Sequence, residues 1–125
     1  MAKKILIQAG KIRAEAELNN TKTAEAIWEA LPLESGANLW GDEVYFAIPV
    51  TMELEKGQVV VQIGDLGYWP VGKAFCIFFG ETPASRNGEI RPASAVTVFG
   101  KVTVDTAVFK NVSSGDKVLV SKINE

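Results

Sequence analysis

The feature that most constrains the fold is an uninterrupted apolar stretch at residues 74–79, Ala-Phe-Cys-Ile-Phe-Phe. A half-buried strand alternates apolar and polar residues, whereas this stretch has no polar face. Such a strand has to be covered on both sides, as at the centre of a barrel or a sandwich. Residues 64–70 precede it and are predicted to form a glycine-punctuated turn that carries Tyr68 and Trp69. The sequence therefore predicts one segment that joins an aromatic surface turn to the deepest strand of the core.

Length and charge indicate a single domain over residues 1–125 with no general attraction to polyanions. The net charge of −2 argues against nucleic acid or an anionic membrane as a partner. No stretch approaches the roughly 18 apolar residues that a membrane span needs, and the first residues lack the apolar run of a signal peptide. The predicted location is the cytoplasm. The oligomeric state is not indicated by any pattern in the chain.

The absence of histidine excludes several chemistries. Ser-His-Asp and Cys-His catalysis need an imidazole base, and histidine is also the commonest metal ligand. With a single cysteine, a structural zinc site is excluded as well. Cys76 lies inside the apolar stretch, where a free cysteine behaves as a small hydrophobic residue. No catalytic residue, metal ligand or cofactor is predicted.

The order of the predicted elements favours a barrel. Alternation at residues 12–18 is typical of a half-buried strand, and about eight short strands follow one another with glycine turns between them. A helix is predicted from Thr21 or Thr23 up to Pro32, with Trp28 as its anchor on the sheet rather than as a ligand-stacking residue. Asp105 can cap a second, short helix. Two helices beside a closed antiparallel barrel would cover its open ends.

Several segments carry a resemblance to a known family. These are residues 40–46 (WGDEVYF), 64–70 (GDLGYWP), 72–83 (GKAFCIFFGETP) and 91–96 (RPASAV). They resemble a small bacterial and archaeal family of stand-alone cyclophilin-like domains, and the resemblance covers nearly the whole chain. It implies a mainly β fold, a cyclophilin-like closed eight-stranded antiparallel β-barrel with two capping helices. It brings no established activity with it.

A candidate binding site is predicted where aromatic residues gather near one cation. Tyr45 lies on the face of its strand opposite Val44 and Phe46, so it points away from the core that those two fill. The predicted pocket is a groove at one mouth of the barrel. Its predicted ligand-binding residues are Glu43, Tyr45, Tyr68, Trp69, Arg91 and Ser94.

Aromatic walls with one arginine suit a small carboxylate-bearing molecule or a peptide, so a groove-based binding protein is the predicted function. The competing interpretation of Trp40 and Trp69 is that they only fill the barrel ends. Two other classes of function remain open. One is an enzyme, either a weak peptidyl-prolyl isomerase or a small-molecule enzyme related to the cyclophilin-like domains of oxoprolinase and allophanate-hydrolase systems. The other is a structural interaction module.

Prolyl isomerase activity should be undetectable in a coupled peptide assay. Cyclophilins use an arginine in a Phe-x-x-Arg motif beside a phenylalanine-lined proline pocket, and none of Arg13, Arg86 and Arg91 lies in that context. A rate well above background that disappears in Arg86→Ala or Arg91→Ala would contradict this expectation.

Overall fold

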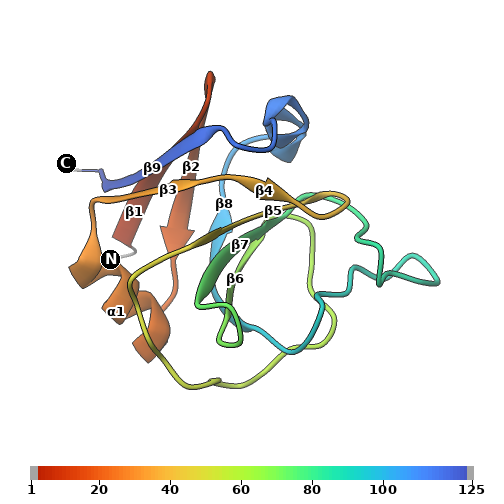
Figure 1. The fold of residues 1–125 in the computed structure, drawn as a ribbon. Helices are drawn as coiled ribbons and strands as arrows, with labels where there is room; N and C mark the ends of the chain where they lie inside the picture. Colours follow the sequence, from red (N-terminus) through yellow and green to blue (C-terminus); the bar gives the residue numbers. More distant parts are fainter. Residues whose placement is uncertain (1–2, 124–125) are drawn as a thin grey trace.

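Nine antiparallel strands form one continuous sheet that curls into a nearly closed barrel (Figure 1). The computed structural model describes residues 3–123. The strands are β1 (Lys3–Ala9), β2 (Ile12–Leu18), β3 (Leu33–Gly36), β4 (Asn38–Leu39), β5 (Glu43–Ala47), β6 (Asp65–Trp69), β7 (Ala74–Phe78), β8 (Thr97–Val102) and β9 (Lys117–Lys122). Their order in the sheet is β3-β9-β1-β2-β8-β6-β7-β5-β4. The predicted fold class, a mainly β antiparallel barrel, is confirmed.

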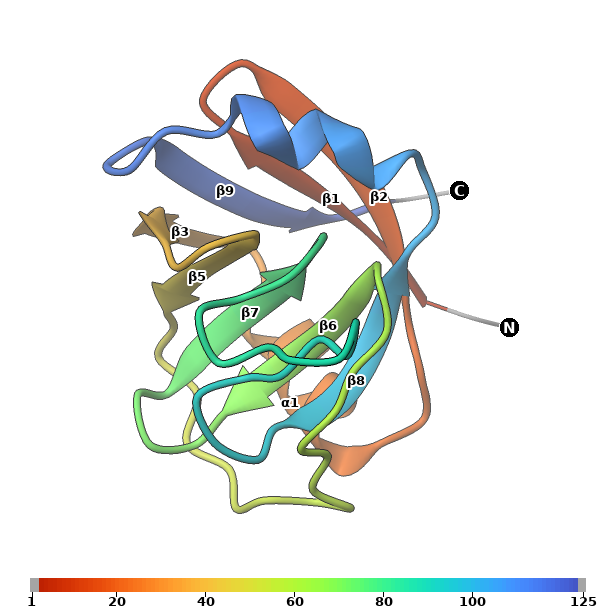
Figure 2. The same ribbon diagram turned by 90° about the vertical axis from the view of Figure 1, so that its right-hand side faces the viewer.

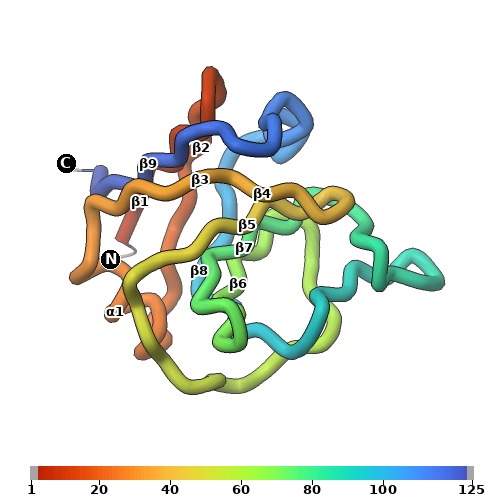
Figure 3. Tube along the Cα trace, viewed as in Figure 1, coloured from red at the N-terminus to blue at the C-terminus, as the bar shows by residue number. Residues whose placement is uncertain are grey.

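The two ends of the sheet meet through one short run of chain. β3 pairs with β9, and β4 pairs with β5, while only Ala37 separates β3 from β4. The N–H of Ala37 donates to the carbonyl of Asp116 at 2.8 Å, and the Ser35 hydroxyl donates to the carbonyl of Ala47 at 2.8 Å. Figure 3 shows this run passing without a break from β9 to β5. If β3 and β4 are counted as one bent strand, the nine strands become the eight that the sequence predicted.

β7 is buried on both faces, as its lack of polar residues predicted. Phe75 and Ile77 lie in the main core inside the barrel. Ala74, Cys76 and Phe78 lie in a second core on the outer face. Each of these side chains is at most 2% exposed. β7 is therefore the strand around which both cores are built.

Three phenylalanines fill the centre of the barrel. The ring of Phe75 stacks on Phe46 with 4.7 Å between centroids and meets Phe99 edge-on at 4.9 Å. Beside Phe99, the pairing of β6 with β8 shifts register. A Cβ on the next residue, Gly100, would lie 2.5 Å from the carbonyl oxygen of Glu17. Glycine at this position therefore lets β8 approach β2 closely.

The second core is covered by loops. Val61 pairs with Ile90, and Gln58 pairs with Val96, so residues 58–61 and 90–96 hold each other over the outer face of β6 and β7. Figure 2 shows the loop after β7 lying in front of these two strands. The outer face of β6 and β7 is consequently covered around Cys76 and Phe78.

A hairpin turn lies within that loop at an Asn-Gly pair, the dipeptide most typical of such turns. Asn87 and Gly88 both have positive φ, +55° and +75°, which is the pattern of a type I′ turn. Arg86 and Glu89 pair across the turn.

Two helices lie at opposite ends of the barrel (Figures 1 and 2). They are α1 (Lys22–Ala30) and the 3-10 helix η1 (Thr106–Asn111). Thr21 is the N-cap of α1, and its hydroxyl accepts from the N–H of Ala24 at 3.0 Å; the Asp105 carboxylate caps η1 in the same way. Ile27 of α1 and Phe109 of η1 are fully buried in the main core, so the predicted capping helices are confirmed. Neither of these helices of the described chain could span a membrane.

The prediction of a turn at residues 64–70 was wrong for most of that segment, because β6 begins at Asp65. Gly64 does adopt a left-handed conformation, with φ of +92°. Gly67, in contrast, lies inside the strand, where a Cβ would come within 2.9 Å of the Val96 side chain. This glycine serves close packing rather than chain reversal, which takes place at residues 70–73.

Replacing Phe78 with alanine should lower the free energy of unfolding by roughly 3 to 5 kcal/mol, because it empties a fully buried ring from the outer core. Urea denaturation measures the change. Val71→Ala, at a side chain that is 77% exposed, serves as the control and should stay within about 0.5 kcal/mol of the parent. Equal stability of Phe78→Ala and the parent would contradict the double burial of β7.

Candidate functional site

The alternation of β5 places two chemically active side chains outside the barrel. Val44 and Phe46 point into the main core and are almost completely buried. Glu43 and Tyr45 therefore point to the outer face, as the sequence predicted. Tyr45 lies directly opposite Cys76 in the pairing of β5 with β7.

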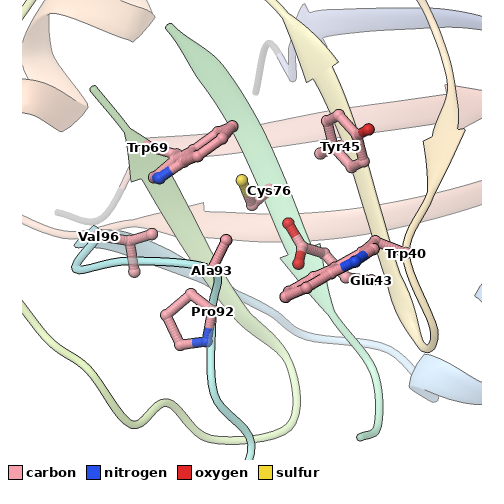
Figure 4. Close-up of a pocket in the computed structure, with 8 residues that line it drawn as sticks. All are labelled: Trp40, Glu43, Tyr45, Trp69, Cys76, Pro92, Ala93 and Val96. Carbon is pink, nitrogen blue, oxygen red and sulfur yellow. The ribbon is translucent and has the colours of Figure 1, made fainter. Parts of the chain in front are cut away.

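A pocket of about 210 Å³ lies on this outer face. β5, β6 and β7 supply its floor and part of its walls, the turn between β4 and β5 supplies Trp40, and the end of the loop before β8 supplies the remaining wall (Figure 4). The lining residues are Trp40, Glu43, Tyr45, Trp69, Cys76, Pro92, Ala93 and Val96. Figure 4 shows the Glu43 carboxyl between the rings of Trp40 and Trp69, with Tyr45 beside them. The pocket is thus walled by three aromatic rings around one carboxyl group.

The ring of Trp69 is fixed in place from two sides. Its Nε1–H donates to the hydroxyl of Ser94 at 2.6 Å. A Cβ on Gly72 would lie 2.8 Å from the six-membered ring, so the indole rests directly on the glycine backbone. A wall held in this way needs little reorganisation when it contacts a ligand.

Glu43 is the buried ionisable group of the pocket. It is only 5% exposed, and its Oε1 has no hydrogen-bond partner among the described residues. Burial raises the pKa of Glu43 to about 7, against a smaller lowering effect of the Cys76 thiol. Near neutral pH, the carboxyl is therefore divided between its neutral and charged forms.

Cys76 is not an activated nucleophile. Burial raises the pKa of its thiol well above the ordinary value, and the neighbouring Glu43 raises it further. The sulfur donates a weak hydrogen bond to the carbonyl of Ala74 at 3.9 Å. The thiol stays protonated and contributes a small apolar surface to the pocket floor, in line with the interpretation of the sequence.

The expectation that Tyr68 lines the pocket was wrong. Tyr68 is fully buried inside the barrel, where its hydroxyl donates to the carbonyl of Val50 at 2.6 Å and accepts from the N–H of Met52. Because β6 is a strand, neighbouring residues point to opposite faces, and only Trp69 reaches the outside. Tyr68 instead ties the loop after β5 to the core.

The expectation that Arg91 lines the pocket was also wrong. Its guanidinium pairs with the Glu89 carboxylate at 2.9 Å, away from the pocket lining. The backbone of Arg91 is held by two side chains: its N–H donates to the Ser85 hydroxyl, and its carbonyl accepts from Thr82. Ser94 does not line the pocket either, but it orients Trp69, so it belongs to the support of the site.

Five residues that line the pocket were not among the predicted site residues: Trp40, Cys76, Pro92, Ala93 and Val96. Cys76 could have been found, because it lies on the outer face of β7 and is smaller than its neighbour Phe78, which leaves a hollow opposite Tyr45. The position of the loop could not have been found, since it depends on long-range contacts such as that between Gln58 and Val96.

The chemistry available in the pocket is limited to hydrogen bonding, aromatic contact and proton transfer. Within residues 3–123, no three histidine, cysteine, aspartate or glutamate side chains come together as metal ligands would. Glu43, with a pKa near neutrality, is the group that could accept or donate a proton.

Comparison with known proteins gives a consistent result. Residues 3–121 match the protein family described as Cyclophilin-like. The solution structure of the hypothetical protein AF2241 from Archaeoglobus fulgidus is 42% identical, covers 98% of this chain and 95% of its own, and superposes with a TM-score of 0.83. The structure of McbB in complex with tryptophan is 16% identical, with a TM-score of 0.74 over 97% of this chain and 45% of its own, which shows a shared fold. A search of curated proteins found no match.

The stability of the protein should depend on pH through Glu43. The pKa of Glu43 is about 7 in the folded chain, against an ordinary value of 4.5. The folded chain is therefore most stable below pH 4.5, where this carboxyl is neutral, and it loses that stability as the pH rises through about 7. The loss should be on the order of 3 kcal/mol. Urea denaturation across this range measures it, and Glu43→Gln should abolish that part of the slope.

Glu29→Gln is a matched control for this measurement, because Glu29 is an exposed glutamate on α1. It should retain the pH dependence of the parent. The same slope in Glu43→Gln and the parent would show that another group causes it.

Proposed function

The chain belongs to the cyclophilin-like family, and we propose that it is a binding protein whose ligand occupies the pocket on the outer face of β5, β6 and β7. The observation that carries the proposal is the convergence of three aromatic rings on a buried carboxyl group, one oxygen of which has no hydrogen-bond partner within residues 3–123. Burying such an oxygen without a partner is costly, so native proteins seldom keep one without a reason. A ligand that donates a hydrogen bond would remove this cost.

The size of the pocket restricts the ligand. Sites for drug-sized molecules usually measure about 300 to 1,000 Å³. A cavity of about 210 Å³ suits a smaller organic molecule or a single side chain of a peptide. Three aromatic walls favour a ligand with an apolar or cationic surface over a strongly hydrated one.

The prediction of a carboxylate-bearing ligand loses its main support in the structure. That expectation depended on Arg91 as an anion-binding group, and Arg91 pairs with Glu89 outside the pocket. A ligand carboxylate would face Glu43 instead, and like charges repel at short range.

Tryptophan, with which McbB, a protein of the same fold, was solved, is a first probe of mixed character: its indole and ammonium group suit the pocket, and its carboxylate does not. At 16% identity, that likeness carries the fold and not the site. Probing with tryptophan therefore tests the pocket without assuming a shared activity.

Catalysis is the second candidate function, and a specific observation favours it. A carboxyl group with a pKa of about 7 is tuned to the range in which general acid–base catalysis is most effective. Glu43 would then transfer a proton to or from a ligand held between Trp40 and Trp69. A ligand that is recovered chemically altered after incubation would favour this function over simple binding.

Freshly purified protein should carry or accept a small ligand in native mass spectrometry, and Trp69→Ala should reduce its occupancy by about tenfold or more while leaving the fold intact. Removing the indole deletes one wall, and stacking contacts of this kind contribute roughly 1 to 2 kcal/mol.

Trp28→Ala is the matched control, because Trp28 lies on α1 under Lys3 and Lys122 and does not line the pocket. It should bind as the parent does. Equal loss in both variants, or no loss in Trp69→Ala, would contradict the assignment of the pocket.

A further inference from the structure

We propose that the pocket recognises a small organic ammonium group, held by the Glu43 carboxylate and by the faces of Trp40, Tyr45 and Trp69. This inference rests on the proposed binding function and specifies the chemical class of the ligand. Four features of the pocket support it: its charge, its unpartnered oxygen, its aromatic walls and the rigidity of one of them.

The charge of the pocket is negative or neutral. Among the described residues that line it, none carries a positive charge, and Glu43 is the strongest acid of the set. An anionic ligand would have no cationic partner among these lining residues. A cation would pair with the carboxylate of Glu43, which is only 5% exposed, and charge-assisted hydrogen bonds are about twice as strong as neutral ones.

The unpartnered oxygen sets the kind of cation. Oε1 of Glu43 is buried and accepts no hydrogen bond within the described chain. An ammonium group with N–H bonds would satisfy this oxygen directly, whereas a fully alkylated nitrogen would not. A primary or secondary amine in its protonated form therefore fits the site best.

The aromatic walls supply the remaining attraction. Figure 4 shows the rings of Trp40 and Trp69 on two sides of the Glu43 carboxyl and Tyr45 near a third. The face of an aromatic ring attracts cations, and tryptophan does so most strongly. Carbon substituents of the amine would contact the same rings and the apolar surface of Val96.

The site is also prepared before a ligand arrives. Ser94 and Gly72 fix the indole of Trp69, and the pairing of β5 with β7 fixes the positions of Glu43 and Tyr45. Preorganised walls reduce the entropy lost on binding, so even a small ligand can bind with measurable affinity.

Three probes with one carbon skeleton test the inference: 2-phenylethylamine, 2-phenylethanol and phenylacetate. They share an aromatic ring and differ in a cationic, neutral or anionic head group. Binding is followed by the indole N–H signals of Trp40 and Trp69 in two-dimensional NMR. The indole signal of Trp28 is the internal reference outside the pocket.

The amine should shift the Trp40 and Trp69 signals at concentrations about tenfold lower than the alcohol, and the acid should bind most weakly. In Glu43→Gln, the affinity for the amine should fall about tenfold, to that for the alcohol, while the affinity for the alcohol stays the same. Glu29→Gln should bind all three probes as the parent does. If Glu43→Gln does not fold, Trp40→Leu gives the same test through the loss of one π face.

The outcomes separate this inference from the proposed function. Equal binding of amine and alcohol, tighter binding of the acid, or an unaltered amine affinity in Glu43→Gln would overturn the ammonium assignment and leave the pocket as a binding site. If none of the probes moves the Trp40 and Trp69 signals in the millimolar range, both the inference and the proposed function fail.

Discussion

The burial of β7 on both faces is the constraint on which the rest of the structure depends. Inside the barrel, Phe75 and Ile77 join the main core. Outside, Ala74, Cys76 and Phe78 would be exposed to water if the loops after β5 and β7 did not cover them. Because apolar area removed from water is the main stabilising contribution to folding, the outer loops are held in place by the same strand that centres the barrel.

The pocket is a consequence of this arrangement. The loops cover Phe78 completely, and beside it the small thiol of Cys76, itself only 1% exposed, lies at the floor of the pocket opposite Tyr45. Trp40 and Trp69 lie on either side of this floor (Figure 4), and β7 beneath them is packed on both faces. The site is therefore built mainly on strands, with Trp40 from the turn between β4 and β5 and one wall from a loop that is held by Thr82 and Ser85.

At Glu43, a buried carboxyl group that lowers the stability of the fold is also the group that the proposed binding needs. A carboxyl that is 5% exposed, with a free oxygen, destabilises the folded chain whenever it is charged. Glutamine or a hydrophobic residue would fit the same position at lower cost. A binding site gives a physical reason for a carboxylate here, since groups that are poised to pair with a ligand are unpaired without it.

The sequence by itself determined the barrel class, the double burial of β7, the Asp105 cap of η1 and the outward direction of Glu43 and Tyr45, and it limited the cap of α1 to Thr21 or Thr23. These features follow from local periodicity and capping chemistry, which are properties of neighbouring residues. Only the tertiary structure decided which of Tyr68 and Trp69 reaches the pocket. The glycines near them favour a turn in the sequence, whereas the residues form a strand in the fold. It also decided that Arg91 pairs with Glu89, since the course of a long loop is set by contacts with segments distant in sequence.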